Sequence, residues 1–336
     1  MIPDCPSIRV LSPATVANMV CGFDVLGFCL DEPTDVMTLT LLPGATSITI
    51  RHTDGFDLPC DPALNVAGAA LLAMQEELAG KPPFAGCPPE TPLAFAPRQV
   101  GFDLVIEKRI KPGSGVGSSA ASAAGAVVAA NILLGGIFSR EALVRFAMCG
   151  EKVASGVKHA DNIAPCIYGG VTLIRSIFPL DIVALPAPSL YASVVHPQIE
   201  VRTADARQIL MDKVLLRDAI RQWGNIAGLV AGILQADHSL IGRSLEDVLI
   251  EPVRKILIPG FDRVKESCLS AGALGGGISG SGPSIFMLSA TRSTALSVAE
   301  AMGTVYRDLG IDFHTYVGPI ASSGVRVDPT YEHAVL

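Results

Sequence analysis

A glycine- and serine-rich segment over residues 111–121 (KPGSGVGSSAA) carries the clearest chemical signal in the sequence. Its three glycines recur at every second position, which lets the backbone turn tightly and approach a ligand closely. Alternating apolar residues predict a strand over 101–109, and an alanine-rich run predicts a helix over 120–134. The first amides of such a helix have no partner within it and carry the positive end of the helix dipole. The segment is therefore suited to hold a phosphate group.

Two serines, Ser118 and Ser119, fall where this helix is expected to begin. They could cap the helix, and a hydroxyl at that place can also ligate a cation. The segment is not a Walker A loop, because no lysine follows the glycines at the required position, and it is not the GxGxxG dinucleotide fingerprint. A glycine-rich turn with a serine cap is the simpler interpretation. The full pattern P-x-G-x-G-x-G-S-S-A is much rarer than such a turn, which favours a binding loop.

Composition and charge are those of a globular protein. The 336 residues suffice for two ordinary domains, and 49% hydrophobic against 17% charged residues predicts a substantial core. The net charge is −7 and the sequence has no block of lysine or arginine, which argues against nucleic acid as a partner. In so acidic a protein, an anionic ligand needs local positive charge, for which isolated arginines are the candidates.

Cysteine usage and the apolar runs bear on location. Eight cysteines are scattered without a CxxC or zinc spacing, which predicts a reducing, cytoplasmic compartment. The N-terminal residues lack a charged segment followed by an apolar run, so no signal peptide is expected. Residues 120–138 resemble a membrane span because they are nearly uncharged, but they contain more alanine than leucine, with interspersed glycine and polar residues. We expect a buried helix there and no membrane partner.

Several polar side chains stand in apolar, glycine-punctuated surroundings, where burial is costly unless they are paired. Asn18 and Asp24 are two of them, and a turn-capping role and a binding role are equally compatible with their setting. Glu151, His159 and Asn162 precede a Gly-Gly break, and their gathering indicates a site more than a lone histidine would.

The first half of the chain alternates strands and helices. Residues 35–42 and 46–52 are expected to be paired strands joined by a Pro-Gly turn. Helices are expected over 65–78 and over 139–154, the second capped by its first serine. The proline-rich residues 80–97 are expected to form a surface loop or an insertion.

The second half predicts a ferredoxin-like β-α-β-β-α-β domain that carries an all-helical insert. The proline-rich residues 179–188 are the expected domain boundary. Residues 275–283 (GGGISGSGP) lie between the middle strands of this domain. Their glycine spacing matches the GxGxxG dinucleotide fingerprint, but a strand and not a helix is expected to follow them. This loop either packs against the phosphate-binding segment or is only a tight turn.

Three motifs in a fixed order resemble those of the GHMP kinases, the superfamily of galactokinase, homoserine kinase and mevalonate kinase. They cover residues 13–27, 112–121 and 274–284. The first motif, together with HADNIAP over 159–165, is most similar to the homoserine kinases of that superfamily. The resemblance implies an α+β, two-domain GHMP kinase fold. Residues 1–184 would be an ATP-binding domain like domain 2 of ribosomal protein S5, and 185–336 the ferredoxin-like domain.

The resemblance also implies how ATP and Mg²⁺ are held. Ser118 and Glu151 correspond to Mg²⁺ ligands, and Asn65 falls where the family contacts adenine. The implied ATP-binding set is Pro112, Gly113, Ser114, Gly115, Val116, Gly117, Ser118, Ser119 and Asn65.

For the second substrate, the resemblance implies L-homoserine, phosphorylated on its side-chain hydroxyl to O-phospho-L-homoserine. Asn18 and Asp24 would hold the ammonium and hydroxyl end. Arg207 and Arg254 would clamp the carboxylate, with Thr203 beside them.

The implied catalytic residues are Asn162, His159 and Asp24. A homodimer is implied as well. Two alternatives stay open: another GHMP kinase acting on a sugar or a mevalonate-like alcohol, and a non-catalytic, nucleotide-binding relative.

Overall fold

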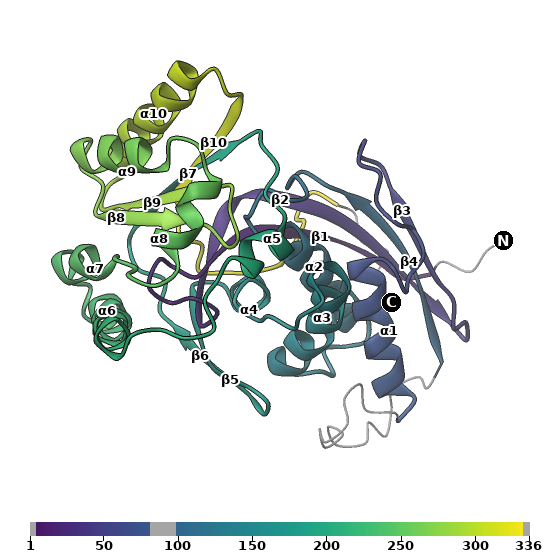
Figure 1. The fold of residues 1–336 in the computed structure, drawn as a ribbon. Coiled ribbons are helices and arrows are strands. Elements are labelled where there is room, and N and C mark those ends of the chain that lie inside the picture. Colours follow the sequence, from purple (N-terminus) through teal and green to yellow (C-terminus); the bar gives the residue numbers. More distant parts are fainter. Residues whose placement is uncertain (1–4, 81–98, 332–336) are drawn as a thin grey trace.

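A computed structural model describes residues 5–80 and 99–331, which form two packed α/β units (Figure 1). The predicted loop over 80–97 lies almost entirely outside the described residues. The first sheet consists of β1 (Ser7–Ala17), β2 (Leu26–Pro43), β3 (Ile48–His52), β4 (Val100–Glu107), β5 (Val171–Ile177), β6 (Leu180–Leu185) and β11 (Arg326–Val327). The helices beside it are α1 (Val66–Leu78), α2 (Ser118–Leu133), α3 (Arg140–Ser155) and α4 (Ile163–Tyr168).

The strand pairing of the first sheet differs from the expected hairpin. Strand β4 lies between β2 and β3, antiparallel to β2 and parallel to β3. The prediction that 35–42 pairs with 46–52 is therefore wrong. Strand β3 connects to β4 through α1, and this helical crossover lets the two strands run parallel, as a tight turn cannot. Strand β4 ends at Glu107, and the phosphate-binding segment follows it after three residues.

Helix α2 is the buried helix that the alanine-rich run predicts. Its small side chains let it pack closely against α1, α3, β1 and β2, and twelve of its sixteen residues are buried. It begins at Ser118 with Gly117 as its N-cap, so the two serines stand in the first turn rather than at the cap. Across 5–80 and 99–331, the structure contains no helix long and apolar enough to span a membrane.

The second sheet has the strand order β10-β7-β9-β8 with antiparallel neighbours, the order of a ferredoxin-like domain (Figure 1). Its strands are β7 (Tyr191–Pro197), β8 (Gly275–Ile278), β9 (Ile285–Ser289) and β10 (Phe313–Pro319). The helices of this half are α5 (Thr203–Gln208), α6 (Leu216–Gln235), α7 (His238–Ser244), α8 (Glu251–Arg254), the 3-10 turn η1 (Lys255–Leu257), α9 (Phe261–Ser270) and α10 (Arg292–Leu309). Helices α5 to α8 form the insert between β7 and α9, as predicted.

One hydrophobic cluster includes residues of both sheets, and a second one lies between the second sheet and helices α9 and α10. Phe28 of β2 meets Phe286 of β9 edge to face, with ring centroids 5.5 Å apart. After β10 the chain returns to the first sheet, where β11 pairs with β1. Leu30 and Ile320 also form a bridge between β2 and the chain that follows β10. The last described residues of the predicted second domain therefore belong to the first sheet. The division at residue 184 remains a prediction.

Candidate active site

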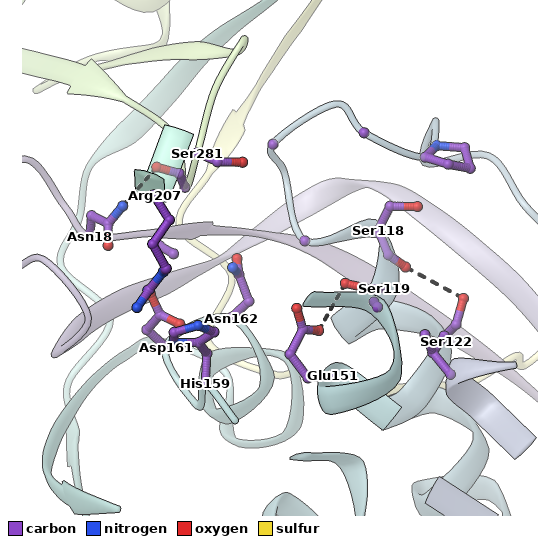
Figure 2. Close-up of a pocket in the computed structure, with 18 of the residues that line it drawn as sticks. Asn18, Ser118, Ser119, Ser122, Glu151, His159, Asp161, Asn162, Arg207 and Ser281 are labelled. Carbon is purple, nitrogen blue, oxygen red and sulfur yellow. Dashed lines mark hydrogen bonds between the residues drawn. The ribbon is translucent and has the colours of Figure 1, made fainter. Parts of the chain in front are cut away.

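A cleft of about 330 Å³ lies between the two units and gathers the polar residues that the sequence singled out. Figure 2 shows the phosphate-binding segment along one side of this cleft and Asn18, His159 and Arg207 on the other. The lining includes Pro112, Gly113, Gly115, Gly117, Ser118, Ser119, Glu151, Asn18, Asp24, His159, Asp161, Asn162, Arg207 and Arg254. The arrangement joins an anion-binding loop to a set of paired opposite charges.

The phosphate-binding segment presents unused main-chain donors to the cleft. Gly115 and Gly117 have φ angles of 81° and 71°, a left-handed conformation that glycine adopts without strain. Among the described residues, none of the main-chain amides of 115–119 donates a hydrogen bond to another protein group. Successive free amides at a helix start form a concave site for an anion. Ser114 and Val116 instead point their side chains into the protein, where both are buried.

Residues of both units contact this segment. A Cβ atom at Gly117 would lie 2.1 Å from Thr15 Oγ1, so the backbone rests directly on β1. Ser279 Oγ and Ser284 Oγ donate to the carbonyl oxygens of Gly115 and Ser114 at 2.7 and 2.6 Å. The glycine-rich loop of the second unit therefore packs against the phosphate-binding segment, the first of the two possibilities that its sequence left open.

A carboxylate and a hydroxyl meet beside the first turn of α2. Ser119 Oγ donates to Glu151 Oε2 at 2.8 Å (Figure 2). Burial raises the pKa of Glu151, and the Ser119 hydrogen bond partly opposes that rise. Ser118 lines the cleft but donates its hydroxyl to Ile110 O at 2.8 Å. Glu151 is thus hydrogen-bonded to Ser119, whereas the Ser118 hydroxyl bonds Ile110 O, because one helical step turns the two hydroxyls to different sides. The prediction that Ser118 is a Mg²⁺ ligand stays a prediction.

Asn65 lies outside the cleft lining and acts as the N-cap of α1. Its Oδ1 accepts from the amides of Ala67 and Gly68, and its Nδ2 donates to Pro59 O at 2.6 Å. The side chain is buried and its amide is used in capping, and the contact of Asn65 with adenine stays a prediction. The apolar side chains of Leu58 and Val66 line the cleft instead.

The loop between β1 and β2 is held in an unusual backbone conformation. Asn18, Met19, Val20 and Asp24 all have positive φ, which is uncommon for residues other than glycine and rare for a β-branched one. Asn18 Oδ1 accepts the amide of Asp24 at 3.1 Å, and Asn18 Nδ2 donates to Gly280 O at 2.8 Å. Such conformations persist where the surroundings enforce them, typically at functional sites. Here they turn the Asp24 carboxylate into the cleft.

Two arginines of the second unit face Asp24. Arg207 Nη2 donates to Asp24 Oδ1 and Oδ2 at 2.9 and 3.0 Å. Arg254 is buried and donates to Ala206 O and Gly280 O, and its guanidinium lies 4.9 Å from the Phe23 ring centroid. Burial lowers the pKa of Arg254, and the charge of Arg207 lowers it further. Thr203 begins α5, but its side chain lies outside the part of the chain that the structure describes.

A third wall of the cleft, the α4 wall, is formed by His159, Asp161 and Asn162 at the start of α4. Asn162 Oδ1 accepts from Thr15 Oγ1 at 2.9 Å, and His159 Nδ1 lies 3.7 Å from Asp24 Oδ1. Burial lowers the pKa of His159, although Asp24 opposes the shift. Asp161, which is not among the predicted site residues, is buried in this wall. Burial, then the charges of Asp24 and Glu151, raise the pKa of Asp161 to about 7.

The cleft and the two-unit fold define a small-molecule kinase of the GHMP type. The family model described as the GHMP kinases N terminal domain matches residues 65–170, and the one for the GHMP kinases C terminal domain matches 229–308. GHMP kinases are phosphotransferases that use ATP.

More specific relatives carry one name. The chain is 44% identical to the homoserine kinase of Chloroherpeton thalassium, over 94% of this chain and 98% of that one. It is also 44% identical to that of Chlorobium phaeovibrioides, over 96% and 99%. The crystal structure of homoserine kinase from Cytophaga hutchinsonii superposes with a TM-score of 0.87 at 44% identity, covering 98% of both chains. The protein belongs to the homoserine kinase family.

Proposed function

We propose that this protein transfers the γ-phosphoryl group of ATP to the side-chain hydroxyl of L-homoserine and releases ADP and O-phospho-L-homoserine. The hydroxyl oxygen forms a bond to the γ-phosphorus as the bond to the β–γ bridging oxygen breaks, and the hydroxyl loses its proton. Phosphoryl transfer depends mainly on positioning and on neutralising charge. The free amides of 115–119 supply the first anion site.

The Asp24–Arg207 pair is the observation that supports an amino acid as acceptor. Each member of this ion pair is a partner for one charge of a zwitterion: the ammonium fits Asp24, and the carboxylate fits Arg207. Arg254 adds a second guanidinium on the carboxylate side. Binding then exchanges one internal ion pair for two between protein and ligand. A sugar or a mevalonate-like alcohol carries no ammonium, so Asp24 would lose its partner without gaining another.

The Ser119–Glu151 pair fits a Mg²⁺ site. Magnesium in kinases is held by one or two protein oxygens together with phosphates and waters, and the half-buried pair offers a carboxylate and a hydroxyl beside the anion site. When bound there, Mg²⁺ offsets the charge of the β- and γ-phosphates. The residues proposed to hold it are Glu151 and Ser119, while Ser118 contributes its main-chain amide to the anion site.

The α4 wall is proposed to face the reacting hydroxyl. Asn162 can orient the hydroxyl through its side-chain amide, and His159 stands beside Asp24. Asp161 has a pKa of about 7, which suits a group that accepts a proton near neutral pH.

A coupled assay of ADP release with ATP, Mg²⁺ and a panel of small alcohols tests the proposal. Homoserine should turn over with a kcat/KM at least about 100-fold above serine, a sugar or mevalonate, because those lose a charge partner or the chain length. Turnover of a sugar or of mevalonate in preference to homoserine would favour the first alternative. Nucleotide binding without turnover of any alcohol would favour the non-catalytic relative.

Two further expectations extend the proposal. Leu216, Ile220 and Trp223 of α6 are 68%, 55% and 58% exposed at helical spacing, which supports a homodimer built on this face. Light scattering of the wild type and of Ile220→Glu would test it.

The described cysteines are free thiols, which supports a reducing, cytoplasmic location.

A further inference from the structure

A buried ion pair lies against the phosphate-binding segment, at the border of the cleft. The Lys108 ammonium meets the carboxylate of Asp35, and their side chains are 2% and 0% exposed. Lys108 follows the end of β4, and Asp35 belongs to β2. Burying two charges is costly, and it is tolerated only where additional hydrogen bonds satisfy both groups.

The ammonium of Lys108 has a partner for each of its three hydrogens. Besides the Asp35 carboxylate, Nζ donates to Ser118 O at 2.7 Å and to Ser122 Oγ at 3.0 Å. Ser118 and Ser122 lie one turn apart on α2, and Ser122 Oγ also bonds Ser118 O (Figure 2). Lys108 is therefore tied to the helix end of the phosphate-binding segment.

The carboxylate of Asp35 is tied to the other end of that segment. Its second oxygen, Oδ1, accepts the amides of Arg109 and Ile110 at 2.8 and 2.9 Å. The Ser118 hydroxyl closes the circuit by donating to Ile110 O at 2.8 Å. The start of the segment, at the preceding residues 109–110, and its helical end, at Ser118, are thus joined to each other and to the same buried pair.

We propose that Lys108 and Asp35 are positioning residues that fix both ends of the phosphate-binding segment, so that its amides are arranged for an anion before ATP binds. Lys108 borders the cleft, which would also suit a phosphate ligand, but its hydrogens are all committed and its charge is balanced by Asp35. A donor array fixed in advance needs no reorganisation when the nucleotide arrives. The inference rests on the proposed function only in taking ATP as the ligand.

The two roles predict different results for the double substitution. Lys108→Met alone leaves the Asp35 carboxylate buried, unbalanced and close to the phosphates. Asp35→Asn with Lys108→Met removes both charges and the repulsion with them. A direct phosphate ligand would be lost equally in the single and the double variant.

Binding of ADP, measured by calorimetry without homoserine, is the test. Lys108→Met should weaken ADP binding about 100-fold or more, and the double variant should recover at least about tenfold of this loss. Adenosine, which has no phosphate, should lose at most about threefold in the single variant, because only the phosphates meet the uncompensated carboxylate. A double variant as weak as the single one, or an equal loss for adenosine, would overturn the inference.

Ser122→Ala guards against a single variant that does not fold. It removes one acceptor of the ammonium and leaves both charges in place. ADP affinity should fall about 3- to 10-fold, while the KM for homoserine stays within about twofold of wild type. Unchanged ADP affinity in Ser122→Ala would overturn the positioning role. A wild type that failed to bind ADP would contradict the proposed function instead, so the two failures are distinguishable.

Discussion

Arg207 and Asp24 form an ion pair across the two units of the protein, with both carboxylate oxygens accepting from one guanidinium nitrogen. The pair is only partly buried, with both side chains 35% exposed at the cleft. Such a pair contributes little to stability by itself, and it can open without a large penalty. Its importance is for recognition, because a ligand that separates the two residues must supply a replacement charge to each of them.

Arg207→Ala should impair homoserine binding selectively. The KM for homoserine should rise by at least about 30-fold, because the carboxylate loses a charged partner in a partly desolvated site. The KM for ATP should stay within about threefold, since Arg207 belongs to the opposite wall from the phosphate-binding segment. Steady-state kinetics with each substrate varied in turn measures both.

Arg202→Ala is the matched control, because Arg202 precedes α5 directly but its side chain is 73% exposed and pairs with Glu200 at the surface. It should behave as wild type. Inhibition by gamma-hydroxybutyrate and by aminopropanol, each with one of the two charges, should be weak in wild-type protein. If either compound bound as tightly as homoserine, the exchange of one ion pair for two would be contradicted.

Substitutions of the two neighbouring serines should have different effects. Ser119→Ala removes the hydroxyl that contacts Glu151, so the Mg²⁺ concentration for half-maximal activity should rise about tenfold or more. Ser118→Ala instead removes a hydrogen bond to Ile110 O, so it should lower the free energy of unfolding by about 1 kcal/mol. Magnesium titration and urea unfolding of both variants separate the two effects.

Glu151→Gln should reproduce the magnesium effect of Ser119→Ala, which ties that effect to the pair and not to one hydroxyl. The assignment of Mg²⁺ to Glu151 and Ser119 is contradicted if Ser118→Ala shifts the magnesium requirement and Ser119→Ala does not. The sequence alone could not decide between the two, because adjacent residues differ only by the rotation of one helical step.

More of the fold than of the site could be predicted from the sequence. Periodicity and turn residues were enough to order the elements of the ferredoxin-like half, because local preference and burial agree there. The pairing of 35–42 with 46–52 failed because β4, fifty residues further on, enters between the two strands. Local pattern contains no information about a strand inserted from so far away.

Residues that act through long-range contacts were the ones missed. Asp161 could have been noticed beside His159 and Asn162, but its burial depends on the packing of the α4 wall. Asn65 is the N-cap of α1, a role that an asparagine at a helix start commonly has, and its predicted contact with adenine stays a prediction. Lys108 and Asp35 lie 73 positions apart, and neither stands in a motif.

Gly115 and Gly113 should tolerate alanine differently. Both have positive φ, but a Cβ atom at Gly115 would lie 2.5 Å from Gly282 O, whereas at Gly113 it would meet open space. Gly113→Ala should therefore cost only the conformational strain, about 1 kcal/mol of unfolding free energy. Gly115→Ala should cost at least about 2 kcal/mol more, because the glycine-rich loop of the second unit must move. Urea unfolding that ranked the two variants equally would contradict the close packing of the units.

The raised pKa of Asp161 makes stability depend on pH. In the unfolded chain the carboxyl ionises near its ordinary pKa of 3.8, and in the folded protein near 7. Between these values the folded state holds the extra proton. This contribution to stability is therefore fully present below the lower value, and it is lost as the pH rises towards the higher one.

Asp161→Asn should remove this dependence. From pH 5 to pH 8 the wild type should lose about 2–3 kcal/mol of unfolding free energy relative to the variant, corresponding to about two pKa units. Asp212→Asn, a change at an exposed carboxylate, should follow the wild-type profile. Urea unfolding at both pH values provides the comparison. Parallel profiles for wild type and Asp161→Asn would mean that Asp161 ionises as an ordinary carboxylate, and it would then be a poor candidate for accepting the hydroxyl proton near neutral pH.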